Sequence, residues 1–328
     1  MSHSLFLAIL CGLGVSTAQA QQTIKLGTLY PKTSDFGTVL ETWAKTVKEK
    51  SGGQLELQIF YNGSQGDESS MAGKIKSGQL DGAFFTGSGL SKFYKPVAAM
   101  EMPGLFNGWA ALDKTRDSFQ SEFTKGLKDA GLSLIGWCDP GKMRCFSNGF
   151  AITQPADFRG KKPFQWRDNV IFPEFYKYIG SVSTVQLNTP EVLPNLNTGA
   201  INTLICNSYQ AESMQWGRKL THVNASEDAY SIGALTLSQK KLDALTEELR
   251  QTLITTGATA AKTLMAKLRA QDDAAYNRLK SKMTVTTHSE IQRKLWEKLY
   301  AGTRKNLVTT KVFSADLVTR MERIAANK

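Results

Sequence analysis

The strongest constraint on the fold is an alternation of short apolar strands with amphipathic helices near the N-terminus. Strand-like alternation covers residues 23–29, 55–61 and 80–85. Between these segments, apolar residues at helical spacing cover 36–51 and 69–76, and glycines follow each run. This β-α-β-α-β order is typical of a parallel sheet with crossover helices on its faces. The segment therefore predicts an α/β lobe.

The same rhythm restarts after a connecting stretch at residues 142–167. Helices are expected at 169–179 and 189–197, and strands at 184–187 and 201–205. A chain of 328 residues is long enough to bury two separate cores. The sequence therefore predicts two α/β lobes joined through residues 142–167.

A long apolar stripe covers residues 238–283, which contain no proline and a single glycine, Gly257. This run is much longer than an average helix. With Ser238 as its N-cap, it is either one long helix or two helices with a kink near Gly257. A helix of this length can touch both lobes. Two further amphipathic helices are expected at 291–307 and 313–326.

These patterns divide the chain into five parts, some of which overlap. Lobe I takes residues 21–141 and about 229–262, and lobe II takes 142–228 and about 275–295. The remaining parts are an N-terminal segment at 1–20, the bridging helix at 238–283 and the C-terminal helices at 290–328.

The N-terminal segment reads as a cleaved export signal. Residues 5–15 form an apolar run too short to span a bilayer, and Ala18-Gln19-Ala20 is an A-x-A cleavage site. The segment lacks the usual basic residues before the run. Cys11 would suit a lipoprotein, but the bulky Leu10 precedes it where a small residue is expected. We expect cleavage after Ala20 and a periplasmic mature protein.

The formal charge of +11 does not indicate nucleic-acid binding, because the basic residues are scattered and mixed with acids. A positive excess also suits the capture of anions. Cys138 and Cys145 flank a turn signal at Asp139-Pro140-Gly141, so they either form a disulfide or stay as buried thiols. His222 and His288 lie far apart in sequence, so neither a metal site nor a cofactor is expected.

The candidate site is the connecting stretch itself, which carries Arg144 and Arg167 with Phe164 and Trp166 close by. A planar guanidinium binds a carboxylate through two parallel charge-assisted hydrogen bonds. We expect this stretch to form one wall of a cleft for a small organic anion, namely a carboxylate with an apolar or aromatic part. Arg167 could instead pair with Asp168, and Phe164 could be core rather than a platform for the ligand.

Four further candidates are Tyr30, Glu68, Thr86 and Asn207. Each lies in a loop after a strand or before a helix, where open α/β sheets present their ligands. Glu68 has the alternative role of capping its own helix.

Several phrases, in order along the mature chain, resemble the substrate-binding subunits of tripartite ATP-independent periplasmic (TRAP) transporters, the DctP family. Gly63 to Met71, followed by Lys76 to Asp81, is similar to that family's G-x-L-G-D-E region. Residues 102–106 (MPGLF) resemble its "lPfLF" phrase, and 155–162 (PADFRGKK) resemble "tpeDlkGlK". Residues 190–199 (PEVLPNLNTG) resemble "sEvy.aLqtG".

The resemblance implies a type II-like periplasmic binding protein fold: two α/β lobes, each a sheet flanked by helices, joined by hinge strands and bridged by a long helix. It also implies a carboxylate ligand between the lobes and delivery to the integral membrane permease subunits of a TRAP transporter. A monomer is expected.

The resemblance places Arg144 where the family has an arginine after the lobe-crossing strand. The family's second arginine, which makes the bidentate carboxylate contact, corresponds to Phe164, and Arg167 lies three residues further on. Asn202-Thr203 replaces the family's "DG". Either the carboxylate contact has moved to Arg167, or the ligand binds through Arg144 with its body against Phe164 and Trp166.

Two alternatives to a transport receptor are considered. An exported hydrolase would need His222 or His288, but the chain has no G-x-S-x-G motif. A Ser-x-x-Lys occurs at Ser238 to Lys241, where helix capping is the better explanation. A related receptor could also serve a sensor in place of a permease. We expect a binding protein and not an enzyme.

Overall fold

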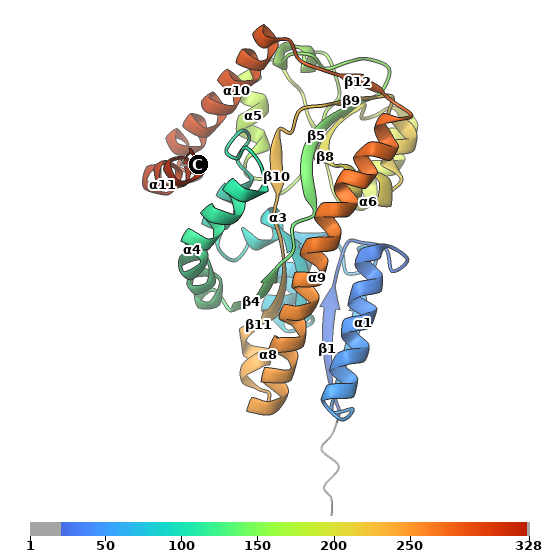
Figure 1. The fold of residues 1–328 in the computed structure, drawn as a ribbon, viewed down its shortest axis with the longest axis vertical. Coiled ribbons are helices and arrows are strands. Elements are labelled where there is room, and N and C mark those ends of the chain that lie inside the picture. The colour runs from blue at the N-terminus through green and yellow to red at the C-terminus, as the bar shows by residue number, and fades with distance from the viewer. Residues whose placement is uncertain (1–20, 327–328) are drawn as a thin grey trace, which may run out of the picture.

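The computed structural model describes residues 21–326 and contains two lobes, each built on its own β-sheet. In Figure 1 one lobe lies below the other, and helix α9 (Glu247–Lys280) runs along both. The predicted signal segment, residues 1–20, lies outside the described residues. The two-lobed α/β architecture predicted from the sequence is confirmed.

Lobe I contains a five-stranded sheet in the order β2-β1-β3-β11-β4. Strands β1 and β2 are parallel, as are β1 and β3, which agrees with the predicted crossovers. Strand β11 enters from far along the chain and pairs antiparallel with both β3 and β4. The strand bounds are Gln22–Gly27 (β1), Leu55–Phe60 (β2), Gly82–Thr86 (β3), Leu132–Trp137 (β4) and Gly233–Ser238 (β11).

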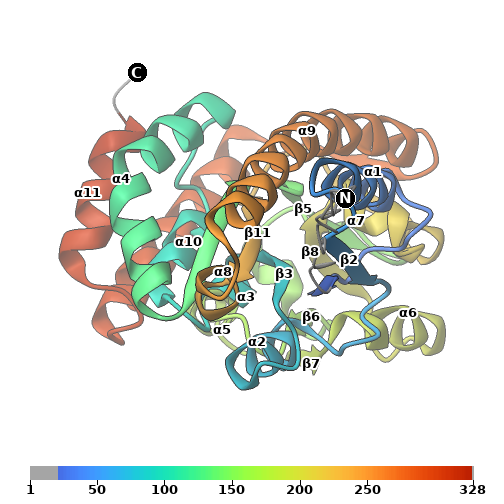
Figure 2. The ribbon, with the colours of Figure 1, turned by 90° about the horizontal axis from the view of Figure 1, so that it is seen from below.

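The helices of lobe I begin where the sequence supplies caps. The Ser34 hydroxyl accepts a hydrogen bond from the Gly37 amide, and the Asp67 carboxylate accepts one from the Ser70 amide. The two helices that follow are α1 (Asp35–Lys50) and α2 (Glu68–Ser77), seen from below in Figure 2. Short helices α3 (Gly87–Leu90) and η1 (Lys95–Glu101) precede the long α4 (Trp109–Asp129).

Lobe II is built around β5 (Gly141–Ser147), which pairs antiparallel with β8 (Thr203–Asn207), β9 (His222–Asn224) and β10 (Ala229–Ser231). A short parallel pair, β6 (Phe164–Trp166) and β7 (Val185–Leu187), lies beside this sheet. The helices of this lobe are α5 (Phe172–Ile179), α6 (Thr189–Thr198) and α7 (Ser208–Ser213), with turns η2 (Pro155–Phe158) and η3 (Trp216–Lys219).

Two short segments lead directly from a strand of one lobe's sheet to a strand of the other's: residues 138–140, from β4 to β5, and Ile232, from β10 to β11. The turn predicted at Asp139-Pro140-Gly141 is wrong, because this stretch continues from one sheet to the other. Cys138, Cys145 and Cys206 are buried free thiols, and burial raises the pKa of each. The buried-thiol alternative is therefore the one that the structure shows.

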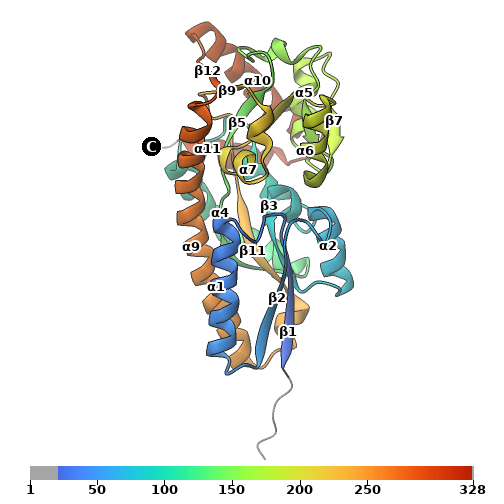
Figure 3. The same cartoon turned by 90° about the vertical axis from the view of Figure 1, so that its right-hand side faces the viewer.

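The predicted long helix is two helices, but the break does not lie at Gly257. Helix α8 (Gln239–Asp243), capped by Ser238 as predicted, ends before Thr246, which caps α9. Gly257 instead sits where α9 packs closely, because a Cβ atom there would lie 2.6 Å from Ile135 Cγ2. Helix α9 lies beside α1 and β4 in lobe I and beside α7 and β5 in lobe II (Figure 3).

The C-terminal helices return across the molecule. Helix α10 (Glu290–Thr309) packs against α5 of lobe II, and α11 (Ala315–Ala326) packs against α4 of lobe I. Within residues 21–326, no helix has the length and apolar character needed to cross a bilayer. The same residues contain no cluster of three or more His, Cys, Asp or Glu suited to a metal ion.

Candidate functional site

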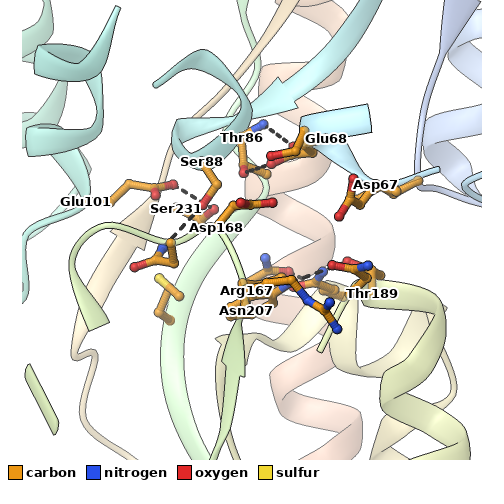
Figure 4. A pocket seen from close by; sticks show the side chains of 17 residues that line it. Asp67, Glu68, Thr86, Ser88, Glu101, Arg167, Asp168, Thr189, Asn207 and Ser231 are labelled. Atoms are coloured by element: carbon orange, nitrogen blue, oxygen red, sulfur yellow. Dashed lines mark hydrogen bonds between the residues drawn. The ribbon is translucent and has the colours of Figure 1, made fainter. Parts of the chain in front are cut away.

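A pocket lies between the lobes and takes its walls from both of them (Figure 4). Its cavity volume is about 60 Å³, several times the roughly 10–15 Å³ that one water needs. The pocket therefore suits a small polar solute. Its lining residues are Leu29, Asp67, Glu68, Ser69, Thr86, Ser88, Glu101, Met143, Trp166, Arg167, Asp168, Asn169, Asn188, Thr189, Asn207, Gln210 and Ser231.

Glu68 is the first residue of α2, and its carboxylate accepts three hydrogen bonds from residues at the end of β3 and in α3. These come from the Thr86 amide at 2.6 Å, the Thr86 hydroxyl at 2.7 Å and the Gly89 amide at 3.0 Å. Burial raises the pKa of Glu68 to about 7, against the opposing effect of these bonds. Its role is thus to hold β3 and α3 in place while its carboxylate faces the pocket.

Glu101 ends η1 and is only 7% exposed. Its Oε1 accepts from the Ile232 amide at 3.0 Å, the Ser231 hydroxyl at 3.3 Å and the Gly87 amide at 3.4 Å. Burial is the main reason that its pKa rises to about 8, and the nearby Glu68 raises it further. Within the described chain, Oε2 has no hydrogen-bond partner.

The opposite wall follows β6, where Arg167, Asp168 and Asn169 come directly after Trp166. Asn169 Oδ1 accepts from the amides of Ile171 and Phe172. The predicted helix at 169–179 begins three residues later, at Phe172, after a turn that the Asn169 side chain holds. The Arg167 side chain is 53% exposed and lies 3.7 Å from Glu191, a contact too long and too exposed to hold it firmly.

Asn207 and Thr189 complete this wall. Asn207 is the last residue of β8 and is nearly buried, and its Oδ1 accepts from the Gln210 amide at 2.7 Å. Its Nδ2 finds no hydrogen-bond partner among residues 21–326, so it is available as a donor to a solute. Thr189, at the start of α6, accepts a long hydrogen bond from Trp166 Nε1 at 3.4 Å.

Two polar contacts connect the lobes across the pocket. Lys92 Nζ lies 3.0 Å from Asp168 Oδ1, and Asn169 Nδ2 donates to Ser88 Oγ at 3.3 Å. Each contact joins a residue after β3 to a residue after β6. The structure therefore has its lobes in contact around the pocket.

Arg144 does not line the pocket, contrary to what the sequence led us to expect. Side chains alternate along a strand, and on β5 it is Met143 that reaches the pocket. Arg144 donates to the carbonyl oxygens of Ala225 at 2.5 Å and Ser226 at 3.2 Å. Its guanidinium also pairs with Glu227 at 3.1 Å and lies 4.0 Å from the ring centre of Tyr276 on α9.

Phe164 and Tyr30 also lie away from the pocket. Phe164 packs in the lobe II core, with its ring centre 4.5 Å from that of Trp166, so the packing alternative for this residue holds. Tyr30 stacks on Phe36 and Tyr209 in the lobe I core. The structure thus brings five predicted residues together at the pocket: Arg167, Trp166, Asn207, Glu68 and Thr86.

Sequence reasoning missed Glu101, Met143 and Asp168. Glu101 had a signal, since it is a lone acid in the apolar run from Val97 to Phe106. Strand alternation next to Arg144 could have identified Met143. Of the described residues, four carboxylic acids and one arginine line the pocket, so the chain's positive excess lies elsewhere.

A small-solute pocket between two α/β lobes bridged by a long helix defines a solute-binding protein of the periplasmic type. The family model described as "Bacterial extracellular solute-binding protein, family 7" (DctP) matches residues 26–308. The chain belongs to this family, whose members include the substrate-binding subunits of TRAP transporters.

Relatives agree with this assignment. A solute-binding protein of Verminephrobacter eiseniae is 24% identical over 280 residues, covering 85% of this chain and 83% of that protein. The sugar acid binding protein DctPAm of Advenella mimigardefordensis, in complex with galactonate, has a similar fold. Its TM-score is 0.85 at 17% identity, covering 93% of this chain and 98% of that one.

A TRAP periplasmic solute binding protein from Ralstonia eutropha H16 with bound (S)-2-acetolactate has a TM-score of 0.86 at 17% identity. The alignment covers 93% of this chain and 99% of that chain. These relatives are binding proteins rather than enzymes.

Proposed function

We propose that this protein captures a small organic acid in the pocket between its lobes and delivers it to the permease subunits of a TRAP transporter. The observation that carries the proposal is a polar pocket formed by both lobes in a chain of the solute-binding family. Two similar structures hold organic acids, galactonate and (S)-2-acetolactate. The small pocket favours a solute nearer to acetolactate in size.

Arg167 and Asn207 are the donors best placed for the carboxylate. Among residues 21–326, Arg167 is the only arginine or lysine that lines the pocket, and the Asn207 amide nitrogen beside it has no hydrogen-bond partner there. Because the pair with Glu191 is long and exposed, Arg167 can turn to a solute at little cost. The carboxylate contact is thus assigned to Arg167, and Trp166 and Met143 supply apolar surface for the rest of the solute.

Capture proceeds through closure of the lobes. A solute that touches Arg167 on one wall and Thr86 or Ser88 on the other binds the closed form better than the open form, and so shifts the equilibrium toward closure. The contacts between Lys92 and Asp168 and between Asn169 and Ser88 then form as well. We place the hinges at 138–140 and Ile232, so that β10 belongs to lobe II and β11 to lobe I, in a periplasmic monomer exported by residues 1–20.

The hydrolase alternative has no support at the pocket. Neither His222 nor His288 lines it. The Ser238 hydroxyl accepts from the Lys241 amide at the start of α8, which is the capping role expected for that Ser-x-x-Lys.

The proposal is tested by mass spectrometry of the solute that co-purifies with the protein, followed by calorimetry of that solute and of a panel of small carboxylates. A carboxylate that binds with micromolar or better affinity, roughly 8 kcal/mol, is expected. Failure to bind any carboxylate would contradict it. Arg167→Met is expected to weaken binding, as quantified below.

A further inference from the structure

The two walls of the pocket differ in charge. In the part of the chain that the structure describes, lobe I contributes carboxyl groups to the pocket, Glu68 and Glu101 among them, and no lysine or arginine. Lobe II contributes Arg167 and the amide of Asn207, together with Asp168, which is already paired with Lys92. Figure 4 shows Glu68 and Glu101 on one side of the pocket and Arg167 and Asn207 on the other.

The two lobe I carboxyl groups face the pocket and, unlike the buried Asp139, are not paired with a cationic side chain of the described residues. Asp139, which is fully buried, pairs with both Arg116 at 2.6 Å and Arg269 at 2.7 Å. Within residues 21–326, no lysine, arginine or histidine pairs with Glu68 or Glu101. Glu101, more than nine-tenths buried, also keeps Oε2 without a partner at the pocket. Burying a charge without a partner is costly, so a cation from outside the chain fits here.

We infer that the solute is a small zwitterion, with its carboxylate at Arg167 and Asn207 of lobe II and a cationic nitrogen at Glu68 and Glu101 of lobe I. This inference rests on the proposed function and narrows its substrate class. A plain organic acid would meet one arginine but two extra carboxyl groups, and would bind only if those groups held protons.

Protonation distinguishes these two classes of solute. Burial places the pKa of Glu68 at about 7 and that of Glu101 at about 8, so both are partly protonated near pH 7.5. The charged groups that share the pocket with Glu101 include Glu68 from α2 and, on the opposite wall, Arg167 and Asp168. The elements packed directly against Glu101, α3 and the β10–β11 connection, present backbone amides and a hydroxyl. A cationic nitrogen lowers both pKa values and releases protons on binding. A plain anion raises them and takes protons up.

The test compares matched solutes by calorimetry at pH 7.5 in phosphate and in Tris, whose ionisation enthalpies differ. The probes are L-alanine against L-lactate, 4-aminobutyrate against 4-hydroxybutyrate, and the co-purified solute itself. The inference expects at least about tenfold tighter binding of the amine-bearing partner and proton release. Equal or tighter binding of the hydroxy acids, or proton uptake, overturns it and leaves the proposed function standing. Binding of no carboxylate at all overturns both.

Glu101→Gln provides the second measurement. Glutamine keeps an oxygen for the Ile232 amide but cannot carry the charge, so the variant is expected to fold. It should lose at least about tenfold in affinity for the amine-bearing solute and nothing for the hydroxy acid. The control is Glu56→Gln on β2, which is exposed beside Lys48 and remote from the pocket. An unchanged affinity for the amine-bearing solute in Glu101→Gln contradicts the inference.

Discussion

The region beside the crossing segments and the walls of the pocket both combine arginines with carboxylates, but only the first pairs them with each other. Beside the crossing segments, Arg116, Arg144 and Arg269 are paired with acids of the chain itself. At the walls, Arg167 is half exposed and Glu68 and Glu101 have no cationic partner. We infer that charged groups paired within the chain hold the hinge together, whereas unpaired groups of the same types remain available to a solute.

The largest effect is expected at Asp139, the fully buried acid between Arg116 and Arg269. Asp139→Asn removes the charge that both arginines share, which should lower the free energy of unfolding by about 3–5 kcal/mol. Urea denaturation measures this. The control, Asp129→Asn, removes an exposed partner of Lys125 and should change stability by less than about 0.5 kcal/mol. Similar stability of the two variants would show that these paired groups do not hold the hinge.

Replacing Arg144 or Arg167 with methionine should have different effects on the free energy of unfolding. Arg144→Met leaves the carbonyl oxygens of Ala225 and Ser226 without their donor and should cost about 2–4 kcal/mol of unfolding free energy. Arg167→Met, at an exposed side chain, should change it by about 0.5 kcal/mol or less. Both are measured by urea denaturation. An equal loss in the two variants would remove the distinction between hinge and wall.

Stability should fall as the pH rises, because burial raises the pKa of Glu68 to about 7 and that of Glu101 to about 8. Between the unfolded value near 4.5 and these folded values, the native state holds more protons than the unfolded state, so stability is greatest at the acid end and is lost toward pH 8. Glu101→Gln should reduce this loss by roughly 1–3 kcal/mol. Melting temperatures at pH 5.5 and 8.5 test this, and an unchanged slope in the variant would count against it.

For ligand affinity the larger effect is expected at Arg167 and the smaller at Arg144, the reverse of their expected effects on stability. Arg167→Met should weaken binding of the co-purified carboxylate by about 1–2 kcal/mol, since one charge-assisted contact is lost. Arg144→Met should bind it as the wild type does, because its side chain faces α9 and not the pocket. Calorimetry decides. The reverse pattern would return the carboxylate contact to Arg144.

The smallest effect is expected for the contact between Lys92 and Asp168 across the lobes. Both side chains are partly exposed, at 30% and 35%, so Lys92→Ala should weaken solute binding by less than about 1 kcal/mol. Small-angle scattering without solute should show a slightly more open average shape. A loss as large as that in Arg167→Met would mean that the contact governs closure.

Much of the fold follows from local patterns. The β-α-β-α-β order of lobe I, the cap at Ser238 and the long apolar stripe all predicted elements that the structure contains. The misplaced break in the long helix has a local reason as well. Gly257 allows close packing against Ile135, whereas Thr246 supplies a capping hydroxyl.

The site was predictable only in part. Arg167, Trp166, Asn207, Glu68 and Thr86 lie at element ends, and end positions follow from the same periodicity that predicts the elements. Arg144 lies within β5, where one residue of register decides which face a side chain takes. Glu101 reaches the pocket from the end of a short helix whose direction depends on contacts with Gly87 and Ile232.

Two α/β lobes, a bridging helix and the family could be predicted from the amino-acid sequence, because periodicity, caps and ordered motifs are local properties. Which charged groups are paired within the chain became known only from the packing of the lobes. Arg144 meets residues 225–227 and Tyr276, more than 80 positions away, while Glu68 and Glu101 meet no cation. Pairing of charges depends on distances between segments far apart in the chain, and those distances exist only once the lobes have packed.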